Sequence, residues 1–387
     1  MSKKYLSQRV AGLPPSGIRK FFDILADMPD VISLGVGEPD FITPRPIMDA
    51  AIESINAGKT QYTSNSGTVE LRNAVSKHLN DLYKIDYAPM SEIIITVGVS
   101  EALYLAMTAL LDQGDEVIIP TPCFVSYQAE VALAGGVPVE IASTIDNDFQ
   151  PDPAAIEAAV TDRTKAILIG YPNNPTGAVA SRETLLEIGK IAEKHDLIVI
   201  SDEIYDQLVY GTEHVCFPAL PGMKKRTVFL GGFSKDYAMT GWRVGYVCAP
   251  EEILTGMLRV HQYTIMSAPT MSQAAAQRAL EIGRPHVDTM RVEYDRRRQL
   301  MVSGFNSMGL KTFEPRGAFY AFPQITSTGM SGDDFAMSLL KEHSVAVVPG
   351  SAFGPGGEGY IRCCYATSYE EVAEALERIE RFIKSKQ

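Results

Sequence analysis

The chain has 387 residues, of which 45% are hydrophobic and 21% charged. This length and composition exclude a single small binding module, a disordered chain and a fibrous repeat, and they indicate two or three domain-sized units. Lys and Arg total 35 against 47 Asp and Glu. The net charge of −12 argues against a nucleic-acid binder, which needs positive charge to neutralise phosphates.

The five cysteines are odd in number and form no Cys-x-x-Cys pair. This pattern is typical of reduced thiols rather than of a disulfide scaffold or a zinc site, so we expect no metal. Residues 1–8 lack the apolar core of a signal sequence, and no later apolar run approaches the roughly 20 residues that span a bilayer. We therefore expect a cytoplasmic protein without a membrane segment.

Short runs rich in β-branched residues recur through the middle of the chain and alternate with helical patterns. Most of these runs are apolar throughout, as expected for strands that helices cover on both faces. Helices are expected at 100–111 and 182–194, where Leu, Ile and Ala recur at steps of three and four. The pattern predicts a three-layer α/β/α domain with a mostly parallel sheet. The expected strands are 93–96, 116–120, 137–141, 166–170, 197–201, 227–230 and 245–249.

The C-terminal part of the chain follows a different pattern. We expect a long helix over 286–308, short strands near 318–322 and 345–348, and a final helix over 369–384. These elements predict a second, smaller α+β domain. The predicted division is an N-terminal arm that contributes to the small domain (1–45), the large domain (46–283) and the C-terminal small domain (284–387).

Polar residues follow three of the predicted strands, at the sheet edge where open α/β folds bind ligands. Ser100 follows a strand and a glycine, so this junction is either an ordinary helix cap or a phosphate cradle of free N–H groups. The turn 173–177 is either a plain tight turn or part of a site. Asp202 ends its strand and is either a helix cap or a buried anion.

Lys235 follows the predicted strand 227–230, within a segment that is rich in glycine. A lone lysine is usually a solvated charge. This one lies among Gly, Phe, Met and the only Trp of the chain, Trp242, and such apolar surroundings lower the pKa of an amine toward nucleophilic use.

These motifs occur in the order seen in the pyridoxal-phosphate-dependent class I aminotransferases, which the chain resembles over essentially its whole length. The resemblance implies fold type I and the transfer of an amino group from an L-amino acid to a 2-oxo acid by a ping-pong Schiff-base mechanism. It also implies pyridoxal 5′-phosphate as the cofactor. The matching segments are 98–102, 173–177, 201–205, 234–245, 317–320, 348–354 and 359–362.

By this resemblance Lys235 would hold the cofactor as a Schiff base and shuttle a proton. Asp202 would pair with the pyridinium nitrogen and keep it protonated. Asn174 and Tyr205 would hydrogen-bond the phenolic oxygen, and Phe124 would stack on the ring.

The resemblance also implies residues for the cofactor phosphate and the substrate. Tyr62 would reach the phosphate from the neighbouring subunit, so we expect a homodimer with shared active sites. Arg362 would bind the α-carboxylate of the substrate bidentately, with Gly37 and Asn174 beside it. Within one chain, the N–H groups of Ser100 and Glu101 are expected to bind the phosphate. The other expected residues at this site are Ala102, Ser234 and Arg243.

Two residues depart from the family pattern. Gly232 stands where many relatives carry a Ser or Thr that binds the phosphate, and the stacking residue Phe124 offers no hydroxyl.

Segments 124–127 and 294–298 are similar to those of the archaeal aromatic aminotransferases, so an aromatic donor is expected, with 2-oxoglutarate as acceptor. An aspartate aminotransferase of the same subgroup and a carbon–sulfur β-lyase stay open as alternatives. A DNA-binding regulator with this fold is disfavoured, because the charge is acidic and no helix-turn-helix extension is visible.

Overall fold

The computed structural model describes residues 5–13 and 30–386, and its largest feature is a seven-stranded sheet with the order β2-β8-β7-β6-β5-β3-β4. Neighbouring strands are parallel, except that β8 runs antiparallel to both β2 and β7. This arrangement confirms the predicted mostly parallel sheet. The strands are β2 (Ile93–Thr96), β3 (Glu116–Thr121), β4 (Val137–Ala142), β5 (Thr164–Gly170), β6 (Ile198–Asp202), β7 (Thr227–Gly232) and β8 (Gly245–Cys248).

Helices cover both faces of the sheet, which explains why most of its strands are apolar throughout. One face carries α5 (Gly98–Leu110), α6 (Ser126–Ala134) and α9 (Glu251–Thr264). The edge strand β4 is only partly covered, whereas β2 and β3 are fully buried. The opposite face carries α3 (Arg45–Asn56), α4 (Val69–Tyr83), α7 (Pro153–Ala158), α8 (Arg182–Lys194) and α10 (Thr270–Ile282).

Local sequence explains where several of these helices begin. The Thr68 hydroxyl accepts a hydrogen bond from the Leu71 amide at 3.4 Å, and Ser181 caps α8 in the same way. Helix α5 begins at Gly98, two residues before the predicted start at Ser100. The φ of +74° at Gly98 turns the chain sharply from β2 into the helix, a conformation that glycine adopts without strain.

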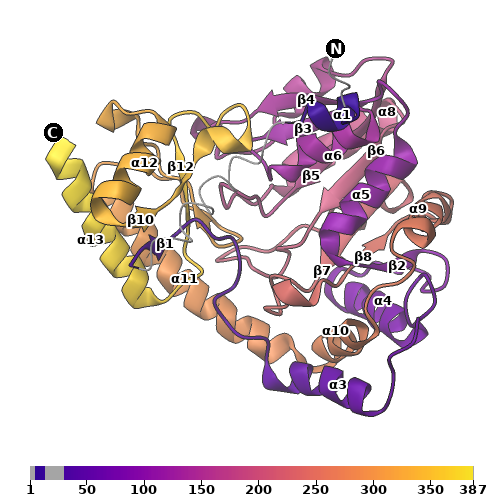
Figure 1. Cartoon of the computed structure of the whole chain (residues 1–387). Coiled ribbons are helices and arrows are strands. Elements are labelled where there is room, and N and C mark those ends of the chain that lie inside the picture. Colours follow the sequence, from indigo (N-terminus) through magenta and orange to yellow (C-terminus); the bar gives the residue numbers. More distant parts are fainter. Residues whose placement is uncertain (1–4, 14–29, 387) are drawn as a thin grey trace.

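A second, smaller group of elements lies to one side of the large sheet (Figure 1). In it, β1 (Ile32–Ser33) pairs in parallel with β10 (Val345–Ala346). A three-stranded antiparallel sheet has the order β11 (Val348–Pro349), β12 (Ile361–Cys364), β9 (Tyr320–Ala321). The predicted strand 345–348 is therefore two strands, because its two halves pair with different partners. The helices here are α11 (Arg284–Ser307), α12 (Gly332–His343) and α13 (Tyr369–Lys386).

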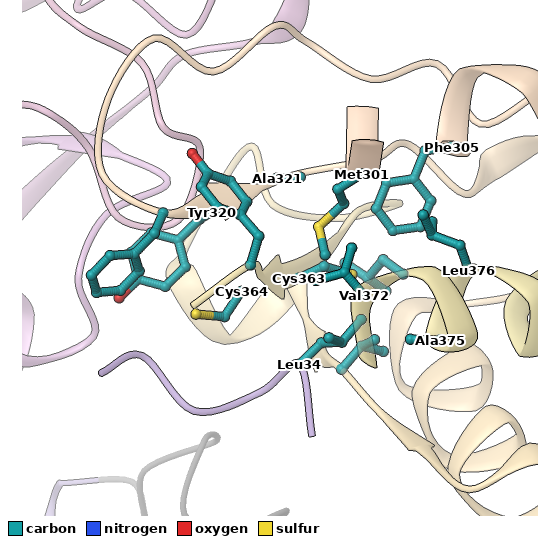
Figure 2. Packing of buried hydrophobic residues seen from close by; sticks show 14 of the residues in the cluster. Leu34, Met301, Phe305, Tyr320, Ala321, Cys363, Cys364, Val372, Ala375 and Leu376 are labelled. Carbon is teal, nitrogen blue, oxygen red and sulfur yellow. The ribbon is translucent and has the colours of Figure 1, made fainter. Parts of the chain in front are cut away.

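The core of this smaller group joins segments that are far apart in sequence. Figure 2 shows Leu34, from the chain after β1, close to Val372 and Ala375 of α13, with Met301 and Phe305 of α11 nearby. The described part of the N-terminal arm thus packs with the C-terminal elements. Residues 1–4 and 14–29 of that arm lie outside the described residues, and the domain boundaries near 45 and 283 stay predictions.

Within the described ranges, no helix combines the length and the apolar composition needed to cross a bilayer.

Candidate active site

A cavity of about 420 Å³ lies at the carboxyl ends of β3, β5, β6 and β7. This edge of the sheet is where ligands bind in open α/β folds. The smaller group of elements completes the walls with Tyr320, Arg362 and the segment 35–38. The cavity brings together ten of the residues predicted from the sequence, namely Gly37, Ser100, Phe124, Asn174, Asp202, Tyr205, Ser234, Lys235, Arg243 and Arg362.

Lys235 lies in the turn that follows β7. Its Nζ donates a hydrogen bond to the backbone oxygen of Gly37 at 2.5 Å and lies 5.8 and 5.7 Å from the ring centroids of Tyr205 and Phe319. Burial disfavours the charged ammonium and lowers the pKa of Lys235 to about 8. A substantial fraction of this amine is therefore neutral, and so nucleophilic, slightly above neutral pH.

Asp202 is the last residue of β6 and is only 7% exposed. Its Oδ2 accepts a hydrogen bond from the Tyr127 hydroxyl at 2.8 Å, and its Oδ1 accepts one from the Ile204 amide at 3.2 Å. Burial raises the pKa of Asp202 to about 6, whereas these hydrogen bonds act in the opposite direction. Asp202 is thus a buried anion at neutral pH, and it forms no salt bridge within the described part of the chain.

Arg362 extends from β12 into the cavity and is held on two sides. Its Nη1 donates to Asn174 Oδ1 at 2.9 Å and its Nη2 to the Gly35 backbone oxygen at 2.6 Å. The guanidinium carbon lies 4.7 Å from the ring centroid of Tyr320, whose hydroxyl lies 2.7 Å from the hydroxyl of Tyr205. Because Arg362 Nε is buried with no partner among the described residues, this guanidinium keeps donor capacity for a ligand.

The turn from β2 into α5 closes tightly against Arg243. A Cβ atom at Gly98 would lie only 2.7 Å from Arg243 Nη2, so a larger residue there would displace this guanidinium and would also strain the φ of +74°. Arg243 Nη1 donates to the Thr240 backbone oxygen at 2.9 Å, and Ser100 and Ser234 also line the cavity. A helix N-terminus with a guanidinium against its first residue is suited to a phosphate group.

Three of the predicted site residues do not line the cavity. The Glu101 carboxylate turns back to accept from the Val97 amide at 2.5 Å and contacts His261 Nδ1 at 2.6 Å. Ala102 is a residue of α5 and packs in the core between this helix and the sheet. Tyr62 is 81% exposed on the surface of the chain. The predicted contact of Tyr62 with a phosphate therefore depends on a second subunit.

Sequence analysis gave no role to six polar residues of the cavity wall, among them Tyr127, Glu130 and Tyr320. Tyr127 and Glu130 lie about one and two helical turns beyond Phe124, so helical spacing was the signal that could have found them. The Glu130 Oε2 atom is buried without a partner among the described residues, and burial raises the pKa of this carboxyl. For Tyr320 the only signal was its place in the matching segment 317–320.

The chain is similar along nearly its whole length to proteins that are named as aminotransferases. The family model "Aminotransferase class I and II" matches residues 29–379. The Bacillus subtilis (strain 168) protein YugH, whose name assigns it provisionally to the aminotransferases, is 53% identical over 379 residues, which is 98% of each chain. An aspartate aminotransferase from Pyrococcus abyssi is 46% identical over 384 residues, covering 98% of this chain and 99% of that one.

A solved structure described as an aromatic aminotransferase from Pyrococcus horikoshii OT3 has a TM-score of 0.91 at 46% identity. The match covers 94% of this chain and 99% of that one. Sequence and fold thus agree along the chain, including the segments that form the cavity. The protein belongs to the class I and II aminotransferase family and is an aminotransferase.

Proposed function

We propose that the protein transfers the amino group of an aromatic L-amino acid to 2-oxoglutarate, with pyridoxal 5′-phosphate bound in the cavity. The observation that carries the choice of donor is a cavity wall that offers aromatic rings, from Phe124 and Tyr320, and few cations. Within the described residues these are Lys235, Arg243 and Arg362. Each has a separate role in the arrangement below, so the described residues offer no further cation for a second carboxylate on the donor.

The residues present fit pyridoxal phosphate, which supplies an aldehyde that captures amines and a ring that accepts electrons. The tight turn at Gly98 with Arg243 forms an anion site for the phosphate. The buried carboxylate of Asp202 lacks a cation and would pair with the pyridinium nitrogen. Phe124, in the cavity wall, offers a ring face for stacking.

Other residues of the cavity wall are proposed to make further contacts with the cofactor. Ser100 and Ser234 would add hydroxyl donors at the phosphate, where the neighbouring position 232 is a glycine. Asn174 and Tyr205 would bind the phenolic oxygen of the ring. The Tyr205 hydroxyl is already oriented by its 2.7 Å contact with Tyr320, so little freedom is lost when it binds.

Lys235 has the chemistry required of the group that holds the cofactor and moves the proton. With a pKa lowered to about 8, its Nζ has a neutral fraction that can take a proton from the substrate Cα near neutral pH. The 2.5 Å contact with Gly37 supports this role, because Gly37 is expected beside the substrate carboxylate. A serine or threonine hydroxyl would be far too weak a base for this role.

Arg362 would bind the substrate α-carboxylate and so direct its Cα toward Lys235. The side chain is held by Asn174 and by Gly35, and its Nε is the unpaired donor. Planar, fixed donors favour a bidentate contact with a carboxylate over a single point contact.

The wall of the cavity that would hold the donor side chain also carries the acids Glu38 and Glu130. An aspartate side chain would add a third carboxylate without a counter-ion from this chain, which costs free energy through desolvation and repulsion. An aromatic side chain would instead contact Phe124 and Tyr320. A counter-ion from a second subunit would serve aspartate as well as 2-oxoglutarate, so the contacts with Phe124 and Tyr320 are the part of this contrast that supports the aromatic donor.

Aspartate is the second candidate donor, because one similar protein is named as an aspartate enzyme and another as an aromatic one, at 46% identity each. The deciding experiment is a steady-state panel with tyrosine, phenylalanine, aspartate and alanine against 2-oxoglutarate. We expect kcat/KM for tyrosine and phenylalanine to exceed that for aspartate by about tenfold or more. A higher value for aspartate would contradict the proposal. With a donor that carries sulfur on Cβ, release of a thiol with ammonia and pyruvate would indicate a β-lyase instead.

The acceptor 2-oxoglutarate carries a second carboxylate of its own, for which the described residues of the cavity wall offer no separate cation. We propose that a homodimer supplies this surface and places Tyr62 at the phosphate of the neighbouring site. The high exposure of Tyr62 in a single chain supports this arrangement. Sedimentation of the active enzyme as a monomer would contradict it.

A further inference from the structure

The residues proposed to carry the chemistry, Asp202, Tyr205 and Lys235, are each followed in sequence by a buried acid. These acids lie behind the cavity rather than in its wall, and no step described above uses them. A buried acid is costly unless it is paired or protonated. The three acids are Glu203, Asp206 and Asp236, which are 2%, 7% and 1% exposed.

Glu203 has a full set of partners. Its Oε1 accepts from the Ser201 hydroxyl at 2.8 Å and from the Phe217 amide at 2.9 Å, and its Oε2 contacts His214 Nε2 at 2.6 Å. This acid can therefore stay ionised in the interior, and it needs no further explanation.

Asp206 and Asp236 differ from Glu203, because they contact each other. Their carboxyl groups lie within hydrogen-bond distance. The Tyr83 hydroxyl donates to Asp206 Oδ2 at 2.5 Å, and Gln207 Nε2 donates to Asp236 Oδ2 at 3.1 Å. The other oxygen of Asp236, Oδ1, is buried without a donor among the described residues.

Two ionised carboxylates in contact, one of them with an unpaired buried oxygen, would be strongly unfavourable. A single proton between them removes the repulsion and supplies the missing donor. We propose that Asp206 and Asp236 share one proton, and that this carboxyl pair acts as a positioning device that fixes the Tyr205 turn against the Lys235 turn. The positioning part of this inference rests on the proposed roles of Tyr205 and Lys235.

The pair also reaches the start of α11. Arg284, the first residue of that helix, donates from Nη1 to Gln207 Oε1 at 3.0 Å, and Gln207 in turn donates to Asp236. Figure 1 shows α11 running from beside α10 to the smaller group of elements. The carboxyl pair thus links two turns at the site to the helix that joins the two parts of the molecule.

The charges around the pair do not supply a dedicated counter-ion. Arg284 also contacts Asp288, at 3.3 Å, and its side chain is half exposed. Burial, followed by the charge of Asp206, raises the pKa of Asp236 well above its ordinary value, in keeping with a retained proton. The titratable groups that face the pair are His78 and Tyr83 from α4, Glu203, Tyr210, His214 and Cys216 from the chain after β6, Tyr237 from the Lys235 turn, and Tyr246 from β8.

The test of the shared proton is the pH dependence of unfolding. A carboxyl whose folded pKa is raised contributes stability that is present below its unfolded pKa and is lost as pH rises toward the folded pKa. Asn at position 236 keeps a donor for Asp206 but cannot lose a proton. The quantity to measure is the difference in Tm between Asp236→Asn and the wild type, both as holoenzymes. We expect this difference to increase by about 2 °C or more between pH 5 and pH 9.

Glu116→Gln is the matched control. This acid is also buried, but the Thr161 hydroxyl and Arg163 lower its pKa, so the wild type gains stability from the charge as pH rises. The Tm difference for Glu116→Gln is expected to fall or stay level over the same range. If the difference for Asp236→Asn fell in the same way, Asp236 would be an ordinary ionised carboxylate and the proposal would be wrong.

The test of positioning is kinetic, with rescue by the conservative variant. We expect kcat of Asp236→Asn to stay within about threefold of the wild-type value. The variant should also retain activity at alkaline pH, where the activity of the wild type declines. Asp236→Ala loses the link, and its kcat is expected to be lower by about tenfold or more. An unchanged kcat in Asp236→Ala would overturn the positioning role. If that variant does not fold, the unfolding series with Asp236→Asn and Asp206→Asn decides the proposal, and it does not depend on substrate or activity.

Discussion

Replacing Arg362 with lysine tests how the substrate carboxylate is held. Arg362→Lys keeps the positive charge but removes the planar fork that now contacts Asn174 at 2.9 Å and Gly35 at 2.6 Å. An ammonium can replace at most one directed contact to the carboxylate, and a hydrogen bond to a charged group contributes about 1.5–3 kcal/mol. We therefore expect kcat/KM for an L-amino acid donor to fall about 10- to 150-fold.

The assay compares tyrosine with tyramine, which has the same ring but no α-carboxylate. The loss in Arg362→Lys should appear with tyrosine and be nearly absent with tyramine, because tyramine has no carboxylate for residue 362 to bind. Arg316→Lys, at an exposed position outside the cavity, is the control and should leave both donors unchanged. An equal loss with both donors would refute the reasoning, since the defect would then be one of folding or cofactor binding.

Three further outcomes follow from the site. Lys235→Ala should show neither the visible absorbance of lysine-bound pyridoxal phosphate nor measurable turnover, whereas an active, coloured variant would exclude Lys235 as the point of attachment. The rate of cofactor capture by the apoenzyme should rise with pH through about 8, where Lys235 becomes neutral, and stopped-flow absorbance that is flat with pH would contradict this. In Gly37→Ala the new Cβ would lie 2.5 Å from the Tyr320 hydroxyl, so we expect a cost of about 1–3 kcal/mol by denaturant unfolding, together with a lower kcat/KM. Gly241→Ala, where a Cβ meets no atom within 4 Å, should behave like the wild type.

The large sheet could be predicted from the sequence because its strands are apolar on both faces and are separated by amphipathic helices. The predicted range of α8 matches the structure, in which Ser181 caps the helix. Prediction failed where pairing partners decide the outcome. The run 345–348 is uniformly apolar, yet its first half pairs with β1 and its second half with β12.

The cavity residues were predictable where they follow a strand or belong to a matching segment, as Asp202 and Lys235 do. Side chains that meet across long stretches of sequence were not. Tyr127 and Asp202 are 75 residues apart, and nothing in either segment marks their hydrogen bond. The contact between Asp206 and Asp236 is equally hidden, because sequence position alone does not show that two turns lie side by side.

The central claim is that Lys235, at the carboxyl end of β7, is the residue that binds the cofactor. The most direct test is to load the enzyme with pyridoxal phosphate, reduce it with borohydride, digest it and locate the pyridoxyl group by mass spectrometry. The account predicts the label on Lys235, in the segment Ser234-Lys235-Asp236. A label on another lysine, with Lys235 unmodified, would contradict it.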